Sequence, residues 1–320
     1  MTANDRGIDV ELGHNALLYS TVDDYVKVIA AFVGAGVAAD EPVLVAVPRP
    51  KAELLRQVVA GKDRVTFLDM CELGRNPARI IPAVRSFVHT QGGRPTRLVA
   101  EPTWPGRSAA ELGEVILHES LLDSGMSEAP SATLCPYDTT ALDPDLICEA
   151  ERHHSHLVIH GGRRRSPTYQ PGTETTLFSA PLSAPPWYAE EMVFDHDLGR
   201  LRRFVEAAAR KAGLETTRLQ DLLLAVNEVA TNAIVHAGTS GVIRCWHDVD
   251  ASEMTCDLRD EGHIGEPLVG RFGPYPLAVQ GWGLWMVNHV CDLVELRSGE
   301  WGTNVRLHVG VHTASGGAGC

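Results

Sequence analysis

The stretch LLLAVNEVATNAIVHA, residues 222–237, decides how the second half of the chain folds. Four apolar side chains recur in it at helical spacing and predict a buried stripe: Leu222, Val226, Val229 and Ala233. Glu228, Asn232 and His236 follow one another at intervals of four residues, so they form a second stripe beside the apolar one. Carboxylate and amide oxygens are ligands that Mg²⁺ takes, so this polar stripe predicts a face that acts on one cation or one water. A solvated face beside a core face is the alternative.

Three short motifs downstream add candidate contacts for a nucleotide. Asp260 stands at the end of a predicted strand, where a carboxylate can accept from the exocyclic amine of a base, and Gly262 lets a ligand approach the backbone. Gly281 and Gly283 precede a predicted helix, whose free N–H groups can face phosphate. Thr303 opens the last predicted strand and can hydrogen-bond near the base. The order and separation of these motifs carry more information than any one of them.

The elements around these motifs predict an α+β two-layer sandwich over residues 191–310. Two helices are expected at about 197–212 and 216–237, and a further helix at 283–291. The strands between and after them are joined by short turns, which indicates a mostly antiparallel sheet with the helices on one face. Residues 311–320 are expected to form a disordered tail, because they are rich in small residues and glycine.

Upstream, residues 1–165 alternate between strand-like and helix-like segments. Short apolar runs predict buried parallel strands at 42–48, 64–69, 96–102 and 132–137, and helices are expected between them. Repeated βα units predict an α/β domain with a parallel sheet and helices on both faces. Residues 166–190 are rich in Pro, Ser and Thr and are expected to form an interdomain linker.

Composition excludes several classes of protein. The net charge is −13 and no run of Lys and Arg dominates, so direct nucleic-acid binding is not expected. No apolar run approaches the roughly 18 residues of a membrane span, and the first residues lack an apolar signal core. The seven cysteines never form a C-x-x-C pair, which suits reduced thiols. We therefore expect a cytoplasmic protein without membrane contact.

The ordered motifs of the second half resemble the nucleotide-binding domain of the GHKL superfamily, which includes DNA gyrase, heat-shock chaperones, histidine kinases and mismatch-repair ATPases. NEVATNAIVHA resembles the N box, DEG the first glycine box and GWGL the second. The compact version, with the phrase GLWMVNHVCDLVEL, is most similar to anti-sigma-factor serine/threonine kinases of the bacterial partner-switching type. The resemblance implies the Bergerat fold, with ATP and Mg²⁺ as cofactors.

The same resemblance implies a role for each motif residue. Glu228 would be the general base that prepares the attacking hydroxyl or water, and Asn232 would coordinate Mg²⁺. Asp260 would contact the adenine amine. The other implied nucleotide contacts, in the pocket wall, the phosphate lid and the edge of the base, are His236, Gly262, Gly281, Gly283, Leu284 and Thr303.

Two departures from the family pattern concern catalysis. Many relatives have D-x-G-x-G where this chain has Asp260-Glu261-Gly262-His263-Ile264-Gly265. The lid EPLVGRFGPYPLAVQ has no Lys and carries only Arg271. Because phosphate charge must be neutralised for transfer, the sequence supports ATP binding more firmly than turnover.

The first half resembles the MEDS family, named after a sensory domain of methanogens and methylotrophs. The resemblance is carried by LDMCELGRNPARIIPAVRSFV, by AEPTWPGRSAAELGEVILHESLL and by CPYDTTAL. It implies a sensory module, related to RecA-type folds without their phosphate loop, that binds an unidentified small molecule. The candidate ligand contacts are polar residues near predicted strand ends, and helix caps or ion pairs are the alternative for each: Asp69, Arg75, Asn76, Glu101, Trp104, Arg107, His118 and Glu119.

A histidine cluster in the same half also suggests a metal site. His156 and His160 are four residues apart and follow His153 and His154, but no cysteine or carboxylate cluster completes the set, and HLVIH is also compatible with a strand in place of a helix. A metal is therefore not expected there.

Three functions remain open. The first is a sensor-controlled serine/threonine kinase that phosphorylates an anti-sigma antagonist and binds a sigma factor; the resemblance also implies a homodimer. The second is a sensor histidine kinase, for which His118-Glu119 is locally acceptor-like but lies in a predicted α/β domain. The third is a non-catalytic module in which nucleotide or sensor ligand changes partner affinity.

Overall fold

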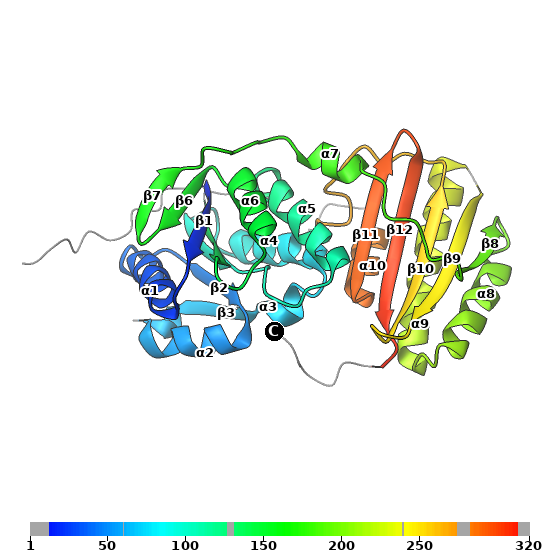
Figure 1. The fold of residues 1–320 in the computed structure, drawn as a ribbon, viewed down its shortest axis with the longest axis horizontal. Helices are drawn as coiled ribbons and strands as arrows, with labels where there is room; N and C mark the ends of the chain where they lie inside the picture. Colours follow the sequence, from blue (N-terminus) through cyan, green and yellow to red (C-terminus); the bar gives the residue numbers. More distant parts are fainter. Residues whose placement is uncertain (1–12, 60, 127–130, 239, 274–281, 313–320) are drawn as a thin grey trace, which may run out of the picture. The chain divides into compact units, whose positions relative to one another are not determined.

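The computed structural model describes residues 13–59, 61–126, 131–238, 240–273 and 282–312. These residues divide into two compact units, with the boundary between Thr173 and Glu174. Figure 1 shows one sheet in each unit. Within the described ranges, none of the helices combines the length and the apolar character that a membrane span requires.

The first unit is built on a seven-stranded sheet with the order β3-β2-β4-β5-β1-β6-β7. Every neighbouring pair is parallel except β6 and β7, which are antiparallel. The predicted mostly parallel sheet is therefore confirmed. The strands are β1 (Gly13–Tyr19), β2 (Val43–Val47), β3 (Val65–Asp69), β4 (Thr96–Ala100), β5 (Ser131–Asp138), β6 (His156–Ile159) and β7 (Gly162–Arg165).

Helices cover both faces of this sheet. Successive residues of a strand point to opposite faces, and in β1 the residues of each face meet a different helix. Leu17 and Tyr19 of β1 pack into one core cluster with Tyr25 and Phe32 of α1. His14 of the same strand points to the other face and meets Glu119 of α5. The helices are α1 (Val22–Ala38), α2 (Arg49–Val58), α3 (Met70–Leu73), α4 (Ile80–Thr90), α5 (Ala109–Gly125) and α6 (Pro144–His153), with short 3₁₀ turns at Lys62–Arg64 and Pro77–Arg79.

Two strands of the first unit, β1 and β7, were not predicted from the sequence, and β6 was left open between strand and helix. β1 lies in the middle of the sheet between β5 and β6, although no strand was expected before the first helix. β6 and β7 form a hairpin at the edge of the sheet, so Arg163–Arg165 belong to a strand. A strand of four residues, such as β6 or β7, carries too little periodicity to be recognised before its partner is known.

The second unit is a five-stranded antiparallel sheet with the order β11-β12-β10-β9-β8. Its core joins apolar side chains of three helices to the inner face of the sheet, which confirms the two-layer sandwich. Figure 1 shows these helices together on one side of the sheet. The elements are α7 (Glu174–Ser179), β8 (Glu190–Phe194), α8 (Leu198–Lys211), α9 (Thr216–Asn232), β9 (Gly241–Asp248), β10 (Glu253–Asp260), α10 (Trp282–Val290), β11 (Leu293–Gly299) and β12 (Gly302–Gly310).

The segment expected as a linker is partly folded onto the second unit. It contains α7, whose Phe178 is buried. Trp301 Nε1 donates to the carbonyl of Ser179 at 3.0 Å, and Arg306 donates to the carbonyl of Ser183 at 2.7 Å. The sequence reading missed these contacts because proline and threonine content marks the absence of long elements and not the absence of packing.

The disordered tail was predicted to begin at residue 311, but residue 311 still belongs to the folded unit. Val311 is buried, and its N–H donates to the carbonyl of Ser252 at 2.9 Å. Residues 313–320 lie outside the described residues. The free cysteines in the described part of the chain are Cys135, Cys148, Cys245, Cys256 and Cys291.

His308 of β12 makes the stability of the second unit depend on pH. Its two ring nitrogens lie 2.6 Å from Glu253 Oε1 and 2.9 Å from Glu295 Oε2. Burial lowers the pKa of His308, but hydrogen bonds to the two carboxylates outweigh burial and raise the pKa to about 9. Because this pKa lies above that of a histidine in the unfolded chain, the stabilisation is complete below pH ~6.5 and is lost as the pH rises through about 9.

We expect the free energy of unfolding of the second unit to fall by about 1 kcal/mol between pH 8 and 9.5 through this histidine. Urea unfolding of the wild type and of His308→Gln at both pH values measures the effect as the difference between the two proteins. His312→Gln is the matched control, because the His312 side chain is 72% exposed. An equal pH dependence in the wild type and in His308→Gln would contradict the assignment.

Candidate functional site

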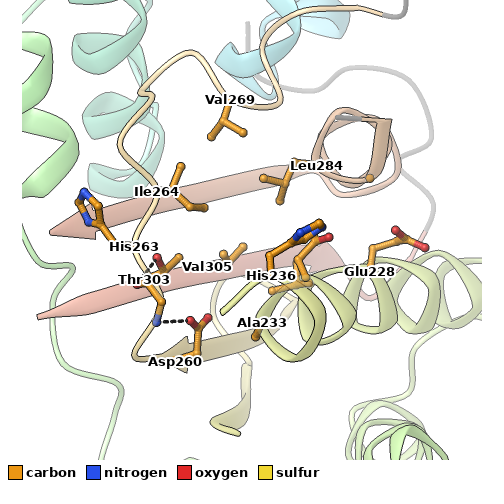
Figure 2. A pocket seen from close by; sticks show the side chains of 14 residues that line it. Glu228, Ala233, His236, Asp260, His263, Ile264, Val269, Leu284, Thr303 and Val305 are labelled. Atoms are coloured by element: carbon orange, nitrogen blue, oxygen red, sulfur yellow. Dashed lines mark hydrogen bonds between the residues drawn. The ribbon is translucent and has the colours of Figure 1, made fainter. Parts of the chain in front are cut away.

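A pocket of about 340 Å³ opens in the second unit between α9, the start of α10 and the ends of β10 and β12. Its volume is in the range of small-molecule sites. Figure 2 shows Asp260 and Thr303 at one end of the pocket and Glu228 at the other. Apolar side chains line the space between the two ends: Val229, Ala233, Ile264, Val269, Leu284 and Val305.

Asp260 is the last residue of β10 and forms one polar end of the pocket. Its Oδ1 accepts from the N–H of Gly262 at 2.7 Å, which leaves Oδ2 for another donor. Burial raises the pKa of Asp260, and the Gly262 N–H works in the opposite direction. A half-buried carboxylate beside apolar walls is suited to accept from a neutral amine.

Glycine at position 302 allows β10 and β12 to approach each other beside the carboxylate of Asp260. Gly302 has a φ of +110°, and an added Cβ would lie 2.2 Å from the carbonyl oxygen of Asp260. No other residue type can occupy that position without moving the backbone. The end of β10 is therefore held against the start of β12.

A relay of hydroxyl groups holds the loop that follows Asp260. Thr303 Oγ1 donates to the carbonyl of Gly262 at 2.9 Å, and Ser298 Oγ lies 2.8 Å from Thr303 Oγ1. Ser298 Oγ in turn accepts from the N–H of Ile264 at 2.8 Å. Since the proton of Thr303 is committed to Gly262, Ser298 donates to Thr303, and the relay has one direction.

The opposite end of the pocket brings Glu228 and Asn232 of α9 to the start of α10. An added Cβ at Gly283 would lie 2.9 Å from Glu228 Oε2 and 3.6 Å from Asn232 Nδ2. Gly283 is in the first turn of α10, so backbone N–H groups at the helix start lie near the carboxylate and the amide. A carboxylate, an amide and a helix N-terminus are together suited to a hydrated divalent cation and a phosphate.

The helix that presents these side chains changes its geometry at the pocket. α9 is α-helical to Asn232 and continues as a π-helical turn from Ala233 to Ala237, which ends at Gly238 with a φ of 66°. His236 lies in this turn, on the wall of the pocket, and is exposed. Single π-turns widen a helix locally and are frequent at functional sites.

The structure gathers eight of the predicted nucleotide contacts around this one pocket: Glu228, Asn232, His236, Asp260, Gly262, Gly283, Leu284 and Thr303. Gly281 lies outside the described residues. Arg271, the only basic residue of the lid sequence, is 4% exposed and does not line the pocket. Ser298 was missed, because a serine inside a strand carries no signal until its partner strand is known.

Two of the sensory candidates in the first unit are helix caps, as the alternative interpretation held. Asp69 Oδ1 accepts from the N–H of Cys71 at 3.0 Å, and Asn76 Oδ1 accepts from the N–H of Ala78 at 3.1 Å. Asp69 also pairs with Arg49 at 3.0 Å. Both side chains thus have local structural roles.

Glu101 is a buried carboxylate at the end of β4. It accepts from Tyr25 at 3.1 Å and from Tyr19 at 3.4 Å, and it pairs with Lys51. Burial raises the pKa of Glu101 to about 7, although Lys51 and the tyrosines work in the opposite direction. Both carboxylate oxygens of Glu101 therefore have partners within the domain.

Four further sensory candidates are buried or stacked, whereas Arg75 is half-buried. The guanidinium of Arg107 lies 3.5 Å from the ring centroid of Trp104 and donates to the carbonyls of Pro102 and Gly74. His118 and Glu119 are both buried on α5. The predicted sensory residues therefore lie in several separate sets of contacts.

Comparisons with known proteins match both halves of the chain. Residues 13–155 match the methanogen/methylotroph, DcmR sensory domain family (MEDS), and residues 195–309 match the histidine kinase-like ATPase domain family. No curated protein matches. A solved structure of the RsbU and RsbW domains of Rv1364c from Mycobacterium tuberculosis is 16% identical, with a TM-score of 0.31, over 39% of this chain and 32% of that one. This chain thus spans about a third of that neighbour, and it carries an N-terminal MEDS domain and a C-terminal histidine kinase-like ATPase domain.

Proposed function

We propose that this chain, a MEDS domain followed by a histidine kinase-like ATPase domain, is a signal-responsive anti-sigma regulator with serine/threonine kinase activity. The ATPase domain binds ATP with Mg²⁺ and transfers the γ-phosphoryl group to a serine or threonine of an anti-sigma antagonist. Partner switching then controls a sigma factor. The observation that carries the proposal is the position of Asp260 at one end of a single pocket, with Glu228, Asn232 and Gly283 at the other.

The two ends of the pocket suit the two ends of ATP. The free Oδ2 of Asp260 accepts from the adenine amine, and the base lies among the apolar side chains that line the middle of the pocket. The phosphates then extend toward Gly283, where N–H groups of the first turn of α10 face them.

Glu228 and Asn232 act at the phosphate end. Asn232 offers its amide oxygen to the cation, a hard oxygen ligand of the kind that Mg²⁺ takes alongside waters and phosphates. Bound Mg²⁺ would neutralise charge on the phosphate oxygens. Glu228 accepts the proton of the attacking hydroxyl, and phosphoryl transfer requires little more from a protein than such positioning and charge neutralisation.

A non-catalytic switch is the second candidate, and the lid favours it. Residues 262–281 contain no Lys, and their one Arg, Arg271, is buried away from the pocket. With fewer positive charges at the phosphates, occupancy by nucleotide would change partner affinity without transfer.

The sensor histidine kinase is disfavoured by the position of its candidate acceptor. His118 is 1% exposed on α5, inside the MEDS domain, so its ring is not accessible to a phosphate donor in the folded domain. The residues just before the ATPase domain form α7 and β8 in place of a dimerising helical hairpin.

The full chain incubated with γ-labelled ATP, Mg²⁺ and a panel of antagonist proteins separates the candidates. Label on a serine or threonine of one antagonist is the expected result. Acid-labile label on the chain itself would support the histidine kinase, and ATP binding without any label would support the switch. Absence of ATP binding would overturn the proposal as a whole.

A further inference from the structure

We propose that the MEDS domain contains a binding site for one divalent metal ion of borderline softness, with zinc as the best fit. The four ligands come from β1, α5, β5 and the residue that follows α6: His14, Glu119, Cys135 and His154. The site is independent of the ATP pocket, and it does not rest on the proposed kinase function.

The spacing of the ligand atoms fits a tetrahedral ion. His14 Nε2 lies 3.0 Å from Glu119 Oε2 and 3.2 Å from Cys135 Sγ, and His154 Nε2 lies 3.5 Å from Glu119 Oε2. All four ligand atoms are within 4.8 Å of one another. A zinc ion with Zn–N distances of about 2.0 Å and a Zn–S distance of about 2.3 Å would separate its ligand atoms by roughly 3.3–3.5 Å.

His154 is held in the tautomer that binds metal. Its Nδ1 lies 2.7 Å from the carbonyl of Ala150, and because a carbonyl only accepts, Nδ1 carries the proton. The lone pair of Nε2 therefore faces the interior of the cluster. Orientation of a ligating histidine by a backbone carbonyl at its other nitrogen is the usual arrangement at metal sites.

Glu119 and His154 present two acceptors to each other without a donor between them. His154 Nε2 is buried and makes no hydrogen bond, and it faces the buried carboxylate of Glu119, which also contacts the side chains of Cys135 and Tyr137. Burying acceptors in this way is costly unless a positive charge compensates them. A cation at the centre of the cluster would satisfy both.

Further ionisable and aromatic groups surround the four ligands. The groups that face the cluster from adjacent elements are Asp123 of α5, His153 of α6 and Tyr137 of β5.

The charges of the site balance when a divalent ion is bound. Cys135 is a buried free cysteine, and a free thiol carries its proton at neutral pH. Binding replaces the thiol proton by the metal: the S–H bond breaks, an S–metal bond forms and one proton leaves to solvent. One thiolate and one carboxylate then neutralise the two charges of the ion in a buried environment.

The ligands are too far apart along the chain for a sequence motif. His14, Glu119, Cys135 and His154 belong to four different segments that only the sheet brings together. The expectation that the histidines near 153–160 lack a completing cysteine and carboxylate is thus wrong for His154. His160 is not a member of this cluster, and its side chain is 77% exposed beside Asp24.

Cobalt substitution tests the site in the full chain. Titration with Co²⁺ is expected to give one bound ion per chain, a thiolate-to-cobalt charge-transfer band and the release of one proton. Zn²⁺ is expected to displace the cobalt and abolish the band. Cys135→Ser should remove the band, and His154→Ala should weaken zinc binding by more than about 100-fold, beyond the usual effect of outer-shell changes.

The matched controls are Cys148→Ser, which removes an exposed thiol on α6, and His160→Ala. Both should keep the band and the stoichiometry of one. Cobalt binding without a thiolate band, or a band that survives in Cys135→Ser, would overturn the proposal. Circular dichroism checks the fold of each variant. If Cys135→Ser does not fold, the charge-transfer band and the proton release of the wild type still decide the outcome. A cluster that binds no metal gives neither signal.

Discussion

Replacement of Glu228 by glutamine is expected to slow phosphoryl transfer to the antagonist by about 10²- to 10⁴-fold, the range that a positioned general base contributes. Glutamine keeps the size and shape of the side chain beside Gly283 but cannot accept the proton of the attacking hydroxyl. Affinity for ATP should change little, because Glu228 lies at the end of the pocket opposite Asp260. Single-turnover transfer of labelled phosphate, with ATP binding measured by calorimetry, separates the two quantities.

Glu206→Gln is the matched control for this variant. Glu206 is a carboxylate of α8, pairs with Arg210 at 2.7 Å and is 40% exposed, so its loss should leave transfer unchanged. A Glu228→Gln variant that transfers phosphate at the wild-type rate would remove Glu228 from the reaction. A variant that loses ATP binding together with transfer would assign Glu228 to nucleotide binding instead.

The polar stripe on α9 could be predicted from the sequence because a helix places its residues by local rules. Glu228, Asn232 and His236 lie on the pocket wall since an interval of four residues repeats one face of any helix. Asp260 and Gly262 were equally accessible to prediction, because an acidic residue followed by glycine at the end of a strand is a local signal. The same holds for the parallel sheet, where apolar runs alternate with helical patterns.

The features that sequence could not supply depend on contacts between distant segments. Ser298 contributes to the pocket through Thr303 on the neighbouring strand and through Ile264 in the loop after β10. The reason for Gly302 appears only when the carbonyl of Asp260 is placed against it. The metal ligands show the same limit, since His14 and His154 lie 3.8 Å apart between ring centroids at opposite ends of the first unit's sequence. Local patterns predict faces of elements, whereas a buried site also depends on register between strands.

Replacement of Asp260 by asparagine is expected to weaken ATP binding by about 2–3 kcal/mol, roughly 30- to 150-fold in Kd. Asparagine keeps an oxygen that accepts from the Gly262 N–H, so the loop and its hydroxyl relay should be retained. Its other atom becomes an NH₂ group, which faces the adenine amine with a second donor and leaves both without an acceptor. The lost affinity therefore comes from the base and not from the phosphates.

Inosine triphosphate distinguishes this cause from a general loss of the site. The base of inosine triphosphate carries a carbonyl oxygen where adenine carries the amine. It should bind poorly to the wild type, where this oxygen meets the carboxylate of Asp260. It should bind better to Asp260→Asn, where the oxygen meets the NH₂ donor of asparagine. Glu261→Gln, which alters the exposed neighbouring carboxylate, should preserve the wild-type preference for ATP. Equal losses for ATP and inosine triphosphate in a folded Asp260→Asn variant would mean that Asp260 shapes the loop and does not read the base.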